Sequence, residues 1–137
     1  MRPTYLADTW FFVAILDRFD SHHAPARRVL RAIGGARVLT HEAVLTEVLT
    51  FFARAGARAR AEAVSKVRDA MQSLDVRSID RTLFLRALAL YETRPDKQYS
   101  LVDCASMVMM RDRGIAHVLT NDHHFRQEGF TVLSDAP

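Results

Sequence analysis

The first apolar stretch of the chain is Thr4-Tyr5-Leu6-Ala7-Asp8-Thr9-Trp10-Phe11-Phe12-Val13, and its only charge is Asp8. The residues before Asp8 are typical of a short β-strand, and the apolar run after it is predicted to continue as a helix through Leu16. Strands that pass into helices in this way are characteristic of α/β proteins. The stretch therefore predicts the first strand of a parallel sheet, with an acid at its carboxyl end.

The rest of the chain repeats this alternation of strand and helix. Further strands are predicted at residues 37–39, 74–79, 116–120 and 130–133. Between them we predict helices at residues 25–33, from a Thr40 cap to residue 54, at 58–72, from an Asp80 cap to residue 91, and around Asp103 up to Gly114, then a short helical turn. Strands separated by helices form parallel sheets covered on both faces. We therefore predict an α/β fold with three layers, α/β/α, around a mainly parallel central sheet of about five strands.

Length and composition indicate one ordered domain that spans residues 1–137. Hydrophobic residues make up 49% of the chain and no repeat or low-complexity segment is visible, which excludes disordered, collagen-like and solenoid classes. The single cysteine, Cys104, cannot form an internal disulfide. Neither a secretory leader nor the run of about 20 apolar residues that spans a bilayer is visible. We therefore expect a cytoplasmic protein without a membrane segment.

The net charge of +3 comes from basic residues that are nearly all Arg. Arginine binds phosphate through planar, bidentate hydrogen bonds, so this composition is compatible with a nucleic-acid partner. Genome composition explains an excess of Arg over Lys equally well. The charge is therefore only weak support for an anionic partner.

Four acids, each almost alone in apolar surroundings, are the candidate functional residues: Asp8, Glu47, Asp103 and Asp122. Burying a carboxylate in such surroundings is costly unless a partner or a cation compensates for its charge. Asp8 and Asp122 follow predicted strands, and parallel sheets bind ligands at the carboxyl ends of their strands. Glu47 and Asp103 lie on predicted helices, and their spacing alone does not show that they reach the same edge. Four such acids, if they converge, would form a metal site.

Local roles also explain these acids. Asp8 and Asp122 are placed to cap the helices that follow them, and the segment from Ser100 to Asp103 resembles a capping box. Glu47 lies within a helix, so its alternative role is an ion pair with a distant Arg. From the residues alone, a four-acid site and a set of separate caps and ion pairs both stay open.

Other reactive side chains are interpreted as structural or peripheral. The pairs His22-His23 and His123-His124 are expected in loop and rim positions, because adjacent residues do not readily share a helix face and no acid–histidine ligand pattern accompanies them. One of His123 and His124 is a lesser candidate for contact with phosphate. Cys104 lies in an apolar helix without a His partner and is expected to be a buried structural thiol.

Four segments of the chain share a common pattern of an acid within apolar and hydroxyl residues: Tyr5-Leu6-Ala7-Asp8-Thr9, Glu42-Ala43-Val44-Leu45-Thr46-Glu47-Val48, Tyr99-Ser100-Leu101-Val102-Asp103-Cys104-Ala105-Ser106 and Leu119-Thr120-Asn121-Asp122-His123-His124-Phe125. In order and position they resemble the four acidic motifs of PIN domains, most of all those of VapC-type toxins of bacterial toxin–antitoxin pairs. The resemblance extends from about residue 4 to residue 133. It assigns the site to Asp8, Glu47, Asp103 and Asp122, with Thr9 and Ser100 as supporting hydroxyls and Asn121 as a lesser candidate at the rim.

The resemblance implies a metal-dependent ribonuclease, and the residue types agree with that activity. Oxygen ligands select hard divalent cations, Mg²⁺ or Mn²⁺, and the absence of a Cys/His ligand set argues against zinc. Asp8 and Asp103 would be the principal metal ligands, with Glu47 and Asp122 completing the site directly or through water. Water activated by metal would attack the RNA phosphate in line, leaving 5′-phosphate and 3′-hydroxyl ends without needing the 2′-hydroxyl.

The resemblance also implies two partners, a second copy in a homodimer and a VapB-like antitoxin whose C-terminal segment lies in the active-site groove. Two alternatives come from other classes of protein. A catalytically inactive PIN-like module would bind RNA or protein without cleaving it, and acid-to-amide changes would then spare its function. A receiver-like phosphotransfer fold also gathers acids at strand ends, but the paired acids at the first strand and the late Lys of such proteins are missing here.

Overall fold

The computed structural model describes residues 3–135 and contains five strands and seven helices in that part of the chain. Met1, Arg2, Ala136 and Pro137, which the predicted domain 1–137 includes, lie outside the described residues. The strands are β1 (Thr4–Ala7), β2 (Arg37–His41), β3 (Asp75–Arg77), β4 (His117–Leu119) and β5 (Thr131–Leu133). The helices are α1 (Thr9–Leu16), α2 (His23–Ile33), α3 (Glu42–Phe51), α4 (Ala57–Ser73), α5 (Arg81–Glu92), α6 (Leu101–Arg113) and α7 (His124–Gln127).

All five strands join one sheet in the order β3-β2-β1-β4-β5, and each neighbouring pair is parallel. At its centre, Leu6 of β1 lies opposite Leu39 of β2 and Val118 of β4. The predicted α/β fold is confirmed, and the sheet is parallel in all its described strands. Strands β2 and β3 lie on one side of β1, and β4 and β5 lie on the other, so the strand order reverses between β1 and β4. In open parallel sheets such a reversal marks the place where ligands bind.

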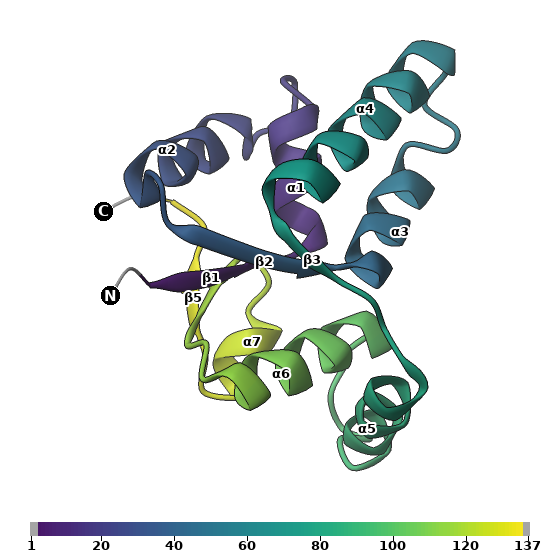
Figure 1. Cartoon of the computed structure of the whole chain (residues 1–137), viewed down its shortest axis with the longest axis vertical. Coiled ribbons are helices and arrows are strands. Elements are labelled where there is room, and N and C mark those ends of the chain that lie inside the picture. The colour runs from purple at the N-terminus through teal and green to yellow at the C-terminus, as the bar shows by residue number, and fades with distance from the viewer. Residues whose placement is uncertain (1–2, 136–137) are drawn as a thin grey trace.

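Side chains of the central strands alternate between two hydrophobic cores. Leu6 and Val118 belong to the core formed with α5, α6 and α7. Their neighbours Ala7 and Leu119 belong to the core formed with α1, α2, α3 and α4. This alternation follows from the two-residue period of a strand. Figure 1 shows the resulting layers, with α1–α4 on one face of the sheet and α5–α7 on the other.

The boundary between β2 and α3 differs from the prediction. Thr40 does not cap a helix; it is a buried residue of β2, and its hydroxyl donates to the carbonyl oxygen of Ala7 at 2.9 Å. His41 is the N-cap instead, and its Nδ1 accepts a hydrogen bond from the backbone N–H of Val44 at 3.4 Å. Pairing between Thr40 and Val76 of β3 keeps β2 extended to this point.

Two other local predictions hold, those for Asp80 and Cys104. Asp80 caps α5, where its Oδ1 accepts from the backbone N–H of Leu83 at 2.7 Å. Cys104 is fully buried, and this burial raises the pKa of its thiol to about 11, as expected for a structural cysteine. Within residues 3–135, no helix is long and apolar enough to cross a membrane.

Candidate active site

Asp8 directly follows β1, at the point where the strand order reverses. It is 5% exposed, and its Oδ2 accepts a hydrogen bond from Thr120 Oγ1 at 3.0 Å. Thr120 directly follows β4, so this contact joins the two strands on either side of the reversal. Asp8 occupies the N-cap position of α1, but its side chain accepts no capping hydrogen bond. The carboxylate is therefore not used as a helix cap.

Glu47 reaches this edge from α3, which lies on the same face of the sheet as α1. The hydroxyl of Thr9 donates to Glu47 Oε1 at 2.5 Å and so joins the start of α1 to α3. Among residues 3–135, Glu47 forms no ion pair with a basic side chain. The alternative role predicted for Glu47, pairing with a distant Arg, is therefore not realised in the described residues.

Asp103 approaches from the opposite face of the sheet, at the start of α6. Ser100 and Asp103 form the predicted capping box. Ser100 Oγ accepts from the backbone N–H of Asp103, and Asp103 Oδ2 accepts from the backbone N–H of Ser100, each at 3.0 Å. A carboxylate offers about four lone-pair positions on two oxygens, so the capping bond leaves most of its acceptor capacity unused. For this acid, capping and ligand binding are compatible.

Asp122 lies between β4 and α7 and is not the predicted cap of this helix, because the N-cap position is occupied by His123. Its Oδ1 accepts from the backbone N–H of His124 at 2.9 Å, and its own N–H donates to Thr120 Oγ1 at 3.1 Å. Thr120 therefore contacts both acids that follow the central strands, a role that the sequence analysis missed. The only signal for it was a hydroxyl at the end of a predicted strand. Within the described part of the chain, Asn121 makes its side-chain contact with His22 Nε2, at 3.3 Å, and not with an acid.

The two buried site acids, Asp8 and Asp103, lie close enough to the other carboxylates for their ionisation to be affected. Burial, followed by the charge of Asp103, raises the pKa of Asp8 to about 7 against the opposite effect of its hydrogen bonds, and Glu47 adds a smaller rise. Burial, and to a lesser extent the charge of Asp122, also raises the pKa of Asp103, although the backbone N–H of Ser100 acts to lower it. Like charges in a poorly hydrated site favour a bound cation.

His124 is a candidate that the sequence analysis did not place in the site. Its Nδ1 lies 3.1 Å from Asp122 Oδ1 and 3.5 Å from Asp103 Oδ2. One donor atom from each of these three side chains lies within 4.8 Å of the other two, a spacing that suits a metal ion. The expected rim position is therefore wrong for His124, whereas His123 is exposed and contacts Arg126. The available signal was the two-residue spacing between Asp122 and His124 at the start of a helix.

The fold and the site together define a class, an α/β/α protein with carboxylates gathered at the carboxyl edge of a parallel sheet. The chain belongs to the PIN domain family, whose sequence profile matches residues 5–130. It is homologous to the 23S rRNA-specific endonuclease VapC20 of Mycobacterium tuberculosis, with 29% identity over 126 residues that cover 92% of this chain and 95% of VapC20. This homology supports a ribonuclease of the VapC type.

Solved structures agree with this family. The crystal structure of M. tuberculosis VapC20, a toxin that cleaves the sarcin–ricin loop, matches with a TM-score of 0.83 and 26% identity, over 93% of this chain and 96% of that chain. A chain of VapBC2 from Rickettsia felis, crystallised with a DNA fragment from its promoter, matches with a TM-score of 0.65 and 12% identity, over 94% and 96%. The second likeness concerns the fold alone.

Proposed function

We propose that this protein is a divalent-metal-dependent endoribonuclease toxin that hydrolyses RNA phosphodiester bonds with its four site acids. The observation that carries the proposal is the difference between the site acids and other acids in their basic partners. Elsewhere in the protein, Arg side chains form ion pairs with Asp75, Asp112, Glu128 and Asp135. Among residues 3–135, none of the four site acids has an Arg or Lys partner, although the chain contains 19 basic residues. Two of the four, Asp8 and Asp103, are buried, and buried carboxylates without an Arg or Lys partner are expected where a metal ion compensates for their charge.

The residues of the site fit Mg²⁺ or Mn²⁺, because carboxylate oxygens are the ligands that these hard cations prefer. We assign Asp8 and Asp103 as the principal ligands, with Glu47 and Asp122 completing the site directly or through water. A bound ion of this kind supplies the Lewis acidity that activates water for in-line attack at phosphorus. The products would carry 5′-phosphate and 3′-hydroxyl ends.

Side chains and backbone at the sheet edge hold the acids in place. All four site acids accept hydrogen bonds, from the hydroxyls of Thr9 and Thr120 and from the backbone N–H groups of Ser100 and His124. These donors restrict the carboxylate rotamers before any substrate binds, which lowers the cost of reaching the reactive geometry. A role for Asn121 at the rim stays a prediction.

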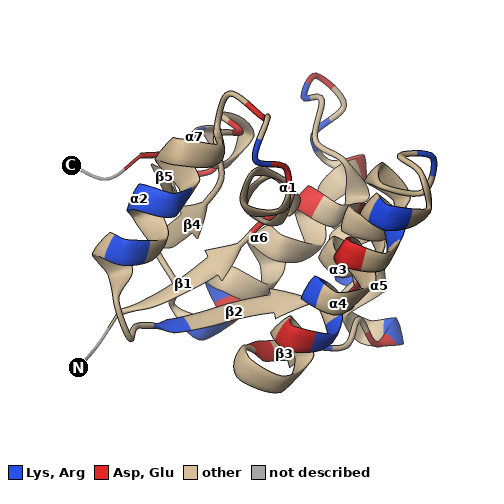
Figure 2. Ribbon diagram, turned by 90° about the horizontal axis from the view of Figure 1, so that it is seen from above, with Lys and Arg blue, Asp and Glu red and all other residues tan. Residues whose placement is uncertain are grey.

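Ribosomal RNA is the substrate class that we propose, by analogy with the 23S rRNA-specific endonuclease VapC20. Figure 2 shows basic residues on α2 and α4, and both helices contact α1, which begins beside Asp8. Their side chains would contact RNA phosphates, which provides affinity without reading the sequence. The choice of the cleaved loop would then depend on RNA shape.

A VapB-like antitoxin and a second copy of the chain are the partners that we propose, in the cytoplasm. An open apolar groove beside Glu47 offers a surface for an antitoxin segment and is lined by Thr9, Ala43, Thr46, Thr50, Phe51 and Val102. A basic residue on that segment would compensate for the site acids while the toxin is held inactive. Exposed apolar side chains on α5 offer a surface for a homodimer: Phe84, Leu85, Leu88 and Tyr91.

Cleavage of total RNA by the purified, antitoxin-free protein tests the proposed function. Reactions with Mg²⁺, Mn²⁺ or EDTA compare the wild-type protein with an Asp8→Asn/Asp103→Asn variant that is shown to be folded by circular dichroism. Asp69→Asn, which alters an exposed acid of α4, is the matched control. We expect discrete metal-dependent fragments from the wild-type and control proteins and none from the double variant. Intact RNA with folded, metal-loaded wild-type protein would instead favour the inactive binding module.

A further inference from the structure

We propose that His124 is a nitrogen ligand of the divalent cation at this site and binds it through Nδ1, together with Asp103 and Asp122. The inference rests on the proposed metal-dependent function and adds a residue and a donor type to the four site acids. A site with this ligand should prefer Mn²⁺ over Mg²⁺, because first-row transition ions accept imidazole donors more readily than Mg²⁺ does.

The distances between the three donor atoms suit a single ion. Nδ1 of His124 lies 3.1 Å from Asp122 Oδ1 and 3.5 Å from Asp103 Oδ2. In an octahedral shell with bonds of about 2.1 Å, neighbouring ligand atoms are about 3 Å apart. Each of the two carboxylate oxygens already accepts one backbone hydrogen bond, and each keeps a further lone pair for a metal ion. All three side chains therefore have a donor atom available at a suitable separation.

The Nδ1 atom of His124 is buried and makes no well-aligned hydrogen bond among the described residues, although carboxylate oxygens of Asp122 and Asp103 lie 3.1 and 3.5 Å away. Leaving a buried ring nitrogen without a partner is costly, and such atoms are rare in folded proteins. The fully buried His41 shows how this chain satisfies a histidine elsewhere. Its Nε2 lies 2.7 Å from Ser106 Oγ, and its Nδ1 accepts from the N–H of Val44. A metal ion shared with the two carboxylates would bind this nitrogen together with the two oxygens beside it.

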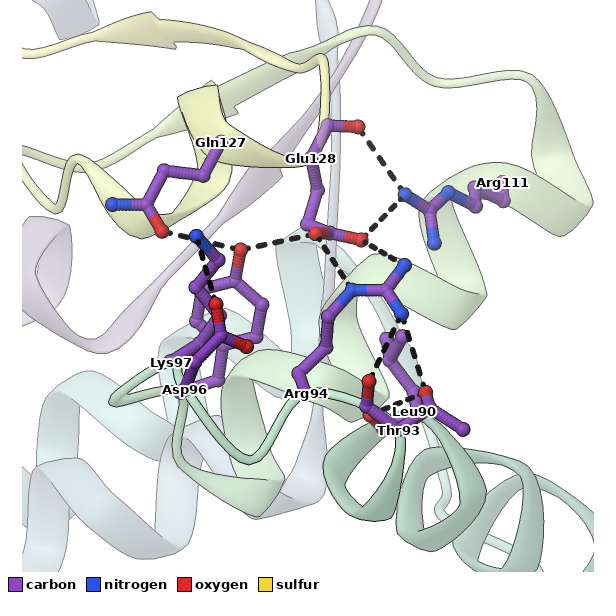
Figure 3. Close-up of polar contacts among 9 residues, drawn as sticks. Leu90, Thr93, Arg94, Asp96, Lys97, Arg111, Gln127 and Glu128 are labelled. Atoms are coloured by element: carbon purple, nitrogen blue, oxygen red, sulfur yellow. Dashed lines mark hydrogen bonds and ion pairs between the residues drawn. The ribbon is translucent and has the colours of Figure 1, made fainter.

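The ring of His124 is held from outside the acidic site. Tyr99 packs against it with ring centroids 5.4 Å apart, and the hydroxyl of Tyr99 donates to Glu128 Oε2 at 3.0 Å. Figure 3 shows the side chains of Arg94 and Arg111 directed at the carboxylate of Glu128, which is 6% exposed. Metal-binding histidines are usually oriented by surrounding contacts of this kind. The network therefore presents the imidazole in one orientation before the ion binds.

One other arrangement uses the same contacts. In it, a protonated His124 forms ion pairs with Asp103 and Asp122 and never binds metal. The two arrangements differ in a measurable quantity, the magnetic coupling between a bound Mn²⁺ ion and a histidine nitrogen.

Electron paramagnetic resonance of the full chain with Mn²⁺ distinguishes the metal-bound arrangement of His124 from the ion-paired one. Loss of the free-ion signal during titration measures Mn²⁺ binding, and spin-echo modulation detects nitrogen bonded directly to the ion. We expect nitrogen modulation in the wild-type protein and in the neighbouring control His123→Asn, and its loss in His124→Asn. His124→Asn should also weaken Mn²⁺ binding about 10- to 100-fold and weaken Mg²⁺ binding less.

Labelling the wild-type protein with nitrogen-15 histidine makes the test independent of any variant, because only a coordinated histidine changes the modulation when it is labelled. Mn²⁺ binding without histidine modulation would overturn the role of His124 and leave the proposed metal-dependent function intact. Failure of the wild-type protein to bind Mn²⁺, or equal binding by Asp8→Asn/Asp103→Asn, would contradict the proposed function, and the role of His124 with it.

Discussion

Replacing Thr120 with Val tests whether its hydroxyl organises the acidic site. The side chain is fully buried, donates to Asp8 Oδ2 at 3.0 Å and accepts from the N–H of Asp122 at 3.1 Å. Val keeps the shape of the side chain and removes both contacts. A hydrogen bond to a charged group contributes about 1.5–3 kcal/mol, and a buried N–H left without a partner costs about 1–3 kcal/mol. We expect Thr120→Val to lower the free energy of unfolding by roughly 2–5 kcal/mol, since coupled contacts do not add fully.

The same change should lower RNA cleavage. Without the hydroxyl, the carboxylate of Asp8 loses the contact that fixes its orientation, and changes to residues that orient metal ligands typically cost about 10- to 100-fold in activity or metal affinity. Because Thr120 is fully buried, it does not contact RNA. We therefore expect the loss in kcat and in the apparent affinity for Mg²⁺, with the KM for RNA little changed.

Thr120→Ser, which keeps the hydroxyl, is the matched control. Urea unfolding at pH 8, above the Asp8 pKa of about 7, gives the free energy of unfolding with the carboxylate charged. Initial rates of RNA cleavage over a range of Mg²⁺ concentrations give the catalytic effect. Wild-type stability and rate in Thr120→Val, or equal damage in Thr120→Ser, would show that the hydroxyl does not organise the site.

Acid stability should depend on Glu128. Burial acts to raise the pKa of Glu128, but hydrogen bonds from two Arg side chains and a Tyr hydroxyl lower it to about 2, below the ordinary 4.5. The contribution of Glu128 to the free energy of unfolding is therefore present above about pH 4.5 and is lost as the pH falls towards 2. Glu128→Gln should remove up to about 3 kcal/mol at pH 7 and flatten the acid part of the stability curve measured by urea unfolding; an unchanged curve would contradict this assignment. Ser100→Ala should cost about 1 kcal/mol in thermal stability and slow RNA cleavage, because it removes the hydroxyl that accepts from the backbone N–H of Asp103 and so loosens the first turn of α6, whereas Ser100→Thr should preserve the capping contact and both properties. Mg²⁺ at about 100 times its Kd should stabilise the wild-type protein by about 2.7 kcal/mol in thermal melts and leave Asp8→Asn/Asp103→Asn unaffected, and equal stabilisation of both proteins would argue against a metal site at these acids.

Local patterns predicted most elements, but one boundary depended on strand pairing. The bounds of β1 and the Asp80 cap agree with the prediction, because apolar spacing and capping residues act over a few neighbouring positions. Thr40 has the chemistry of a helix cap and was predicted to be one. It stays in β2 because it pairs with β3 and its hydroxyl bonds to the backbone of Ala7 in β1. Contacts with residues more than 30 positions away could not be read from the neighbouring sequence.

The amino-acid sequence alone identified the α/β fold, the family resemblance and the four acids, because solitary carboxylates in apolar runs are visible without coordinates. The packing of α3 and α6 on opposite faces of the sheet determined that Glu47 and Asp103 meet Asp8 at one edge. Packing also brought Thr120 and His124 to these acids, since a hydroxyl at a strand end and a histidine at the start of a short helix carry no periodic signal. The acids could be named from local sequence, but their convergence depends on contacts between distant segments.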